Sequence, residues 1–144
     1  MTGNEIFGPF LAMVLLTAIV WMVMYWRRLN YIFRHRIDAQ QLTIPEKGAA
    51  LIPEPVNWPA YNLKNLFELP VLFYALCLYL YVSQSVDPVF VWSGWAYVGL
   101  RAVHSLIHCT VNIVKLRFAA YLLSSVVLWV MAGRASWQFI DGMI

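Results

Sequence analysis

The sequence has little charge and few cysteines. Only 12% of its 144 residues are charged, while 62% are hydrophobic; a soluble domain carries about 25% charged residues. This composition argues against an ordinary soluble fold and indicates an integral membrane protein. The two cysteines, Cys77 and Cys109, both lie in apolar runs, where small buried residues are expected and a disulfide is not.

Several catalytic motifs are also missing. The chain has no glycine-rich phosphate loop, no serine-nucleophile elbow and no HExxH arrangement, so hydrolase and nucleotide-binding functions are not indicated. His104 and His108 are four positions apart but have no third ligand at a suitable spacing, and we expect no metal site. The basic residues cluster around apolar runs, so we expect no nucleic-acid partner.

Four apolar runs are long enough to cross a bilayer, which takes about 20 helical residues. They cover about residues 6–26, 58–83, 89–113 and 118–140, and the polar, proline-containing residues 27–57 are the predicted first loop. Pro59 suits the first turn of the second helix, because its missing N–H needs no partner there. We therefore predict an all-α integral membrane protein, a four-transmembrane-helix bundle with a single membrane domain over residues 1–144.

Basic residues flank two of the three connections. They are Arg27, Arg28, Arg34, Arg36, Lys47 and Lys64 around the first, and Lys115 and Arg117 in the last. The middle connection, around Asp87, has none. The positive-inside rule then predicts termini outside and charged loops in the cytoplasm. Since Glu5 precedes the first run and arginines follow it, we expect a retained helix and not a cleaved signal peptide.

Polar residues in the third run fall on one helical stripe. Tyr97, Arg101, His104, His108 and Asn112 follow one another at intervals of three or four positions. A shorter stripe in the second run contains Tyr61, Asn65 and Glu68. Ionisable groups inside a membrane cost about 2.5–3.5 kcal/mol each, so these stripes are expected to face protein.

Glu68 and Arg101 are predicted to form an ion pair. Counted from the ends of two antiparallel helices, their rises of roughly 15 and 18 Å bring them level. Such a pair either joins two helices or belongs to a ligand site, and the sequence leaves both interpretations open.

Three segments together resemble one known family. They are Asn65-Leu-Phe-Glu68-Leu-Pro70, Arg101-Ala-Val-His104-Ser-Leu-Ile-His108 and Arg117-Phe-Ala-Ala-Tyr121. They are similar to the MAPEG superfamily, the membrane-associated proteins in eicosanoid and glutathione metabolism, and most of all to its uncharacterised bacterial members. The resemblance covers nearly the whole chain and implies a homotrimer, glutathione as co-substrate and a bacterial inner membrane.

The resemblance also implies roles for individual residues. Arg117 matches the catalytic arginine that stabilises the glutathione thiolate. The matching cofactor-binding positions are Asn65, Glu68, Arg101, His104 and Tyr121, with His108 on the same stripe, although another branch of the family has tyrosine there.

Two functional hypotheses follow from the resemblance. One is a glutathione-dependent membrane transferase or peroxidase acting on lipophilic electrophiles. The alternative is a non-catalytic, lipid-binding protein or an accessory subunit of a larger membrane complex.

Overall fold

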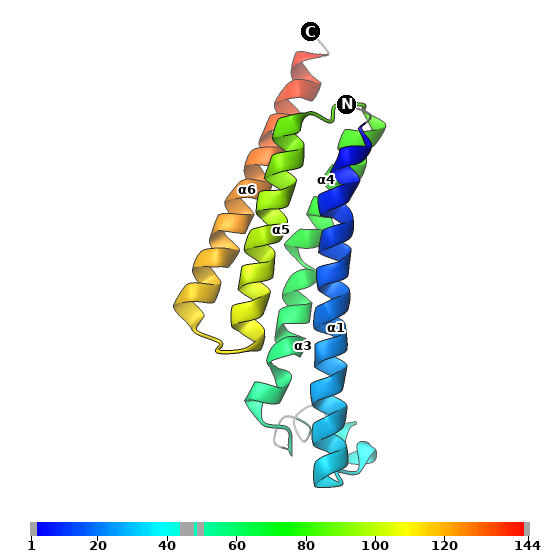
Figure 1. Ribbon diagram of the computed structural model, residues 1–144, viewed down its shortest axis with the longest axis vertical. Helices are drawn as coiled ribbons and strands as arrows, with labels where there is room; N and C mark the ends of the chain where they lie inside the picture. The colour runs from blue at the N-terminus through cyan, green and yellow to red at the C-terminus, as the bar shows by residue number, and fades with distance from the viewer. Residues whose placement is uncertain (1–2, 44–47, 49–50, 143–144) are drawn as a thin grey trace.

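The computed structural model describes residues 3–43, 48 and 51–142. Its helices are α1 (Phe7–His35), α3 (Glu54–Leu66), α4 (Leu69–Val82), α5 (Pro88–Cys109) and α6 (Val114–Asp141), with 3-10 turns at Asn4–Ile6 and Ala39–Leu42. The helices run up and down side by side, and α3 and α4 follow each other in one column (Figure 1). The predicted all-α bundle is confirmed, with its second member broken in two.

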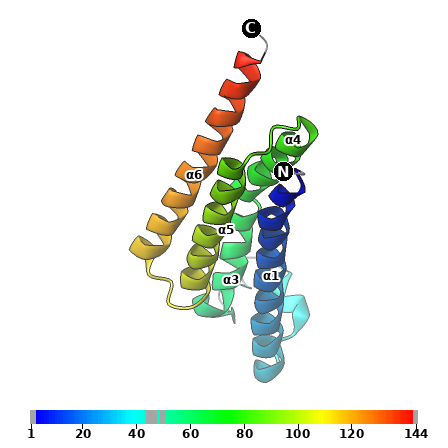
Figure 2. The ribbon, with the colours of Figure 1, turned by 45° about the horizontal axis from the view of Figure 1, so that its top comes forward.

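The two termini lie at the same end of the bundle, together with the α4–α5 connection (Figure 1). The opposite end holds the α1–α3 connection and the α5–α6 turn, and with them the basic residues at the last turns of α1 and the first turn of α6. We call these the terminal end and the basic end. α6 lies at the edge of the bundle beside α5, and α1 lies on the other side of α5 (Figure 2).

Three helical segments are long and apolar enough to cross a membrane: Asn4–His35, Glu54–Val82 and Val114–Asp141. α5 has 22 residues and is about 33 Å long, which matches the roughly 30 Å hydrocarbon core of a bilayer. It is not among these three segments, and its polar stripe makes it less apolar than they are. Large apolar side chains cover the outside of the bundle, among them Leu15 and Val130, which are 60% and 63% exposed. Such a surface suits lipid as its solvent, and the chain is an integral membrane protein.

The predicted first loop is shorter in the structure, because α1 continues past Trp26 to His35. The ring of His35 stacks on Tyr31 with centroids 4.0 Å apart, and Arg36 ends the helix in the left-handed conformation at φ 50°. Arginine is as good a helix former as leucine. The end of an apolar run therefore marks where the membrane part stops and not where the helix stops.

The second predicted helix differs at its start and in its middle. α3 begins at Glu54 with Pro55 in its first turn, so Pro59 lies inside the helix and does not open it. The helix then ends at Leu66, and α4 restarts at Leu69. Pro70 explains the break, because it has no N–H for the carbonyl four residues earlier.

The core joins α1, α4 and α5 closely. Pro9 of α1 lies against Gly94 of α5, where a Cβ atom would come within 2.9 Å of the proline Cγ. Phe73 of α4 lies beside them and stacks on Tyr97 with centroids 4.6 Å apart. Glycine at position 94 thus allows α1 and α5 to approach where the polar stripe of α5 begins.

Candidate functional site

The polar stripe of α5 is buried. Arg101 and Tyr97 have no exposed surface, and His104 and His108 are each 3% exposed. The stripe faces α3, α4 and α6, as the cost of polar groups in lipid requires. Asn112 lies beyond the end of α5, in the turn to α6, with a left-handed φ of 50° that asparagine tolerates better than most residues.

Arg101 holds α5 to the broken end of α3. Its Nη2 donates a hydrogen bond of 2.6 Å to the main-chain carbonyl oxygen of Asn65. That oxygen is available because α3 stops at Leu66 and leaves its last carbonyls without helical partners. The guanidinium carbon also lies 5.2 Å from the ring centroid of Tyr121, within cation–π range.

The predicted ion pair between Glu68 and Arg101 is wrong for the single chain. In the described part of the chain the ion-pair criterion is met only by Arg134 and Asp87, and Glu68 is exposed at the break, with φ −96° and ψ −105°. The level of Glu68 was counted along a continuous helix. That helix ends at Leu66, two residues before Glu68, so the carboxylate no longer follows the stripe.

His104 and His108 lie next to each other on α5, between Arg101 and the C-terminal end of the helix. Nδ1 of His104 donates a 2.7 Å hydrogen bond to the carbonyl oxygen of Arg117; because that oxygen can only accept, Nδ1 carries a proton. The two imidazole rings meet edge to face at 5.5 Å. Nε2 of His104 and both ring nitrogens of His108 are buried without a hydrogen-bond partner among the described residues.

Arg117 completes this cluster from the first turn of α6. Its guanidinium donates to the side-chain oxygen of Asn112, so the α5–α6 turn orients it. Tyr121 is one helical turn further on, with its ring 5.8 Å from that of His104. Arg117 and Tyr121 are both half-buried. The structure thus brings together Arg101, His104, His108, Arg117 and Tyr121, and we call these five residues the polar cluster.

Asn65 and Glu68 are placed differently from this cluster. Asn65 contributes its main-chain carbonyl to Arg101, and its half-buried side chain is in none of the described hydrogen bonds. Glu68 faces outward at the helix break. The described residues contain no group of three metal-ligating side chains either.

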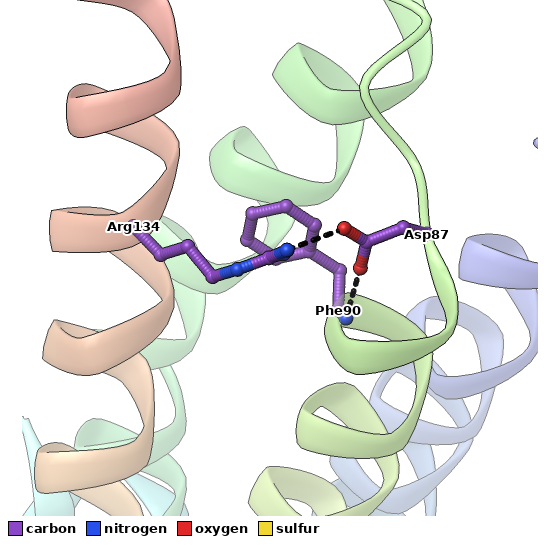
Figure 3. A network of polar contacts seen from close by, with 3 residues as sticks. All are labelled: Asp87, Phe90 and Arg134. Carbon is purple, nitrogen blue, oxygen red and sulfur yellow. Dashed lines mark hydrogen bonds and ion pairs between the residues drawn. The ribbon is translucent and has the colours of Figure 1, made fainter.

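Two polar contacts outside the polar cluster were also not predicted from the sequence. Near the basic end, Nδ2 of Asn62 donates to the buried sulfur of Cys109 at 3.6 Å. At the terminal end, Arg134 of α6 reaches Asp87 at 2.6 Å (Figure 3). An arginine inside the fourth apolar run is a signal that sequence reasoning should have used.

Asp87 accepts two hydrogen bonds at the terminal end. One carboxylate oxygen accepts from the N–H of Phe90 at 3.0 Å and caps α5, while the other accepts from Arg134 (Figure 3). The guanidinium carbon of Arg134 lies 4.4 Å from the ring centroid of Phe90. The hydrogen bond from Arg134 lowers the pKa of Asp87 below its usual value, so the carboxylate is charged and the contact is an ion pair.

Comparison with known proteins gives a single result. No curated protein and no solved structure matches the chain. The family model described as "MAPEG family" matches residues 6–137. This range runs from the start of α1 to the last turns of α6 and includes the three segments on which the resemblance was based. The chain therefore belongs to the MAPEG family.

Proposed function

We propose that the protein is a glutathione-dependent membrane transferase or peroxidase that acts on lipophilic electrophiles. Family membership supports a membrane function related to glutathione or eicosanoids. The observation that carries the proposal is the polar cluster, which gathers two arginines and two histidines near the end of α5 and the start of α6, on the side of the basic end of the bundle. Glutathione is anionic and water-soluble, so its site needs cations that can be reached from water.

The unused donors of Arg101 support an anionic ligand. The guanidinium is fully buried, and its Nε and Nη1 have no partner among the described residues. A buried cation without a carboxylate is costly, and a planar guanidinium binds a carboxylate through two parallel hydrogen bonds. Nε and Nη1 lie on different edges of the guanidinium, so the two carboxylates of glutathione would each satisfy one of the free donors. The imidazole of His104, fixed by its bond to Arg117, would orient one of these carboxylates.

Arg117 is proposed to stabilise the thiolate. An ordinary thiol has a pKa near 8.5, and lowering it by about two units takes about 2.7 kcal/mol. One partly buried guanidinium hydrogen-bonded to sulfur can supply this energy. The bond to Asn112 would hold the guanidinium in one orientation, and Tyr121 would line the same pocket.

The chemistry follows from the thiolate. In a transfer, the thiol proton goes to water at the basic end or to a ring nitrogen of His108, and the sulfur attacks the electrophilic carbon of the acceptor. A C–S bond forms while the leaving electron pair stays with the acceptor oxygen or halide. In a peroxidase reaction, sulfur attacks a peroxide oxygen and becomes a sulfenic acid as the alcohol leaves. The thiol of a second glutathione then attacks that sulfur, water leaves, and the disulfide forms.

We propose a homotrimer in which glutathione lies between neighbouring subunits. Glu68 supports a partner of this kind, because an exposed carboxylate in the middle of a membrane-spanning segment is costly unless something covers it. A neighbouring copy, or the amino group of glutathione, would serve. Glu68 and Asn65 would then contribute to the site from the surface of the helix break.

For the membrane, we propose the bacterial inner membrane with both termini outside and the charged loops in the cytoplasm. The positive-inside rule supports this orientation, because the basic residues flank the two connections at one end of the bundle and both termini lie at the other.

The test is an ultraviolet difference titration of glutathione into the purified protein in detergent, read at the thiolate band. We expect a saturable signal at neutral pH that is lost in Arg117→Ala and kept in Lys115→Ala, which removes an exposed cation from the same turn of α6. If the parent protein gives no signal and calorimetry detects no binding, the enzyme proposal fails and the non-catalytic alternative takes its place.

A further inference from the structure

A groove lies between α1 and α5 on the outside of the bundle. It has a volume of about 420 Å³, within the range of about 300–1,000 Å³ typical of ligand sites. Its apolar walls include Leu16, Val20 and Val23 of α1 and Ala102 and Leu106 of α5. Leu106 is 66% exposed, so the groove opens toward lipid. The two helices lie side by side in Figures 1 and 2.

The groove and the polar cluster use different faces of α5. The groove is lined by Ser105 and Cys109, and the cluster contains His104 and His108. Each groove residue is one position, or 100° around the helix, from its cluster neighbour. A ligand in the groove would therefore be a different molecule from glutathione, and this inference goes beyond the proposed function.

Polar groups gather at the basic end of the groove. Arg27 lines it there and is half-buried, with no acidic partner among the described residues. The hydroxyl of Thr110 donates to the carbonyl oxygen of Leu106 at 2.6 Å and can still accept. Ser105 is 3% exposed, and its Oγ has no hydrogen-bond partner in the described part of the chain.

The length of α1 along the groove, up to Arg27, matches the thickness of one leaflet of a bilayer. From Leu16 to Arg27 the helix rises about 16 Å, close to half of the roughly 30 Å hydrocarbon core. The apolar run of α1 ends at Trp26, so Arg27 lies at the level of lipid headgroups. A ligand that fills the groove is thus apolar over one leaflet and anionic at the interface.

We propose that the groove binds an anionic phospholipid, with one acyl chain along its apolar walls and the phosphodiester at Arg27. Guanidinium groups bind phosphate through paired hydrogen bonds. Ser105 lies one helical turn, about 6 Å, deeper than Cys109, at the depth of the glycerol ester carbonyls, to which its hydroxyl can donate. A free fatty acid has no oxygen at that depth, and for this reason we favour the phospholipid.

The first experiment measures lipid selectivity. The purified full-length protein in neutral detergent receives equal amounts of phosphatidylglycerol and phosphatidylcholine with identical acyl chains, and native mass spectrometry counts the lipid that each protein retains. Both lipids carry the phosphodiester, but the choline cation of phosphatidylcholine cancels its charge and opposes Arg27. We expect the parent protein to prefer phosphatidylglycerol about fivefold, as about 1 kcal/mol per basic residue facing an anionic lipid would give. Arg27→Gln should remove this preference. Arg28→Gln, the matched control, deletes the neighbouring charge at the same depth and should keep it.

Two further variants test the groove itself. Ala102→Leu narrows it and should lower retention of both lipids several-fold, whereas Ala119→Leu on the exposed face of α6 should not. Ser105→Ala should weaken retention of ester-linked phosphatidylglycerol a few-fold and leave the diether analogue, which lacks the carbonyl, unchanged.

The proposal is overturned if the parent protein shows no preference, or if Arg27→Gln and Arg28→Gln lower it equally, which would indicate diffuse surface charge. Preferential retention of oleate over phosphatidylglycerol in competition would also overturn it. Arg117→Ala should retain phosphatidylglycerol like the parent protein. Loss of glutathione binding and loss of lipid binding can therefore be told apart.

Discussion

The contact between Asp87 and Arg134 yields the most quantitative prediction. It closes the terminal end of the bundle by joining the first turn of α5 to the last turns of α6. Replacing Asp87 with asparagine removes the charge but leaves an oxygen that can cap α5, since asparagine is as good an N-cap as aspartate. Asp87→Ala removes both. The two substitutions therefore separate the ion pair from the cap.

The magnitudes follow from exposure and geometry. The side chains of Arg134 and Asp87 are 34% and 31% exposed, so solvent screens the pair, and we expect it to contribute about 1 kcal/mol to the free energy of unfolding. The cap adds about 1 kcal/mol. Asp87→Asn should thus cost about 1 kcal/mol and Asp87→Ala about 2 kcal/mol.

The assay is unfolding by denaturing detergent, followed by circular dichroism, for the parent, Asp87→Ala, Asp87→Asn, Arg134→Gln and the double variant of Asp87→Asn with Arg134→Gln. The double-mutant cycle should give a coupling energy of about 1 kcal/mol. A coupling energy near zero, with the cap cost of Asp87→Ala intact, would refute the ion pair and leave Asp87 as a cap alone.

The same pair predicts a pH dependence. The hydrogen bond from Arg134 lowers the pKa of Asp87 from its ordinary 3.8, so the unfolded state binds the proton more readily than the folded state does. The stabilisation by the carboxylate is complete above about pH 5 and is lost as the pH falls through the unfolded-state and then the folded-state pKa. The difference in stability between the parent and Asp87→Asn should be constant from neutral pH to about pH 5 and shrink below it.

Two other substitutions test the core and the site. Gly94→Ala should destabilise the bundle by about 1–3 kcal/mol, because its Cβ would come within 2.9 Å of Pro9. The control is Gly99→Ala, which has no atom within 4 Å of its Cβ position and should not destabilise the bundle. Equal unfolding midpoints for the two variants would contradict the tight approach of α1 and α5. Arg101→Met should change the free energy of unfolding by less than about 2 kcal/mol, because losing the hydrogen bond to Asn65 is offset by removing a buried charge. The affinity for glutathione, measured by calorimetry, should fall at least tenfold. An unchanged affinity would show that Arg101 is not part of the glutathione site.

The helical class and the face of α5 that carries the polar stripe could be predicted because both depend on local periodicity. The interval of three or four positions between Arg101, His104 and His108 fixes their common face whatever surrounds the helix. These features need only the chain itself. Arg117 and His104 were expected in one site only through the resemblance, and the short turn between α5 and α6 explains why the two lie close together.

The predicted ion pair between Glu68 and Arg101 is wrong because the second helix is not continuous. Glu68 would lie level with Arg101 only on an unbroken helix, and Pro70 interrupts that helix next to the carboxylate. The contact of Arg134 could not be predicted in this way, because its partner Asp87 is 47 positions away. Contacts over that separation depend on how α6 lies along α5, which periodicity does not determine.

The bond from Arg101 to Asn65 ends on the main chain, and this has a consequence for how the two positions can change. Every residue at position 65 offers the same carbonyl, so a substitution there leaves the anchor of α5 intact. The hydrogen bond between the two helices therefore requires arginine at position 101 but no particular side chain at position 65. The side chain at 65 is free to be selected for whatever ligand or neighbouring subunit it meets.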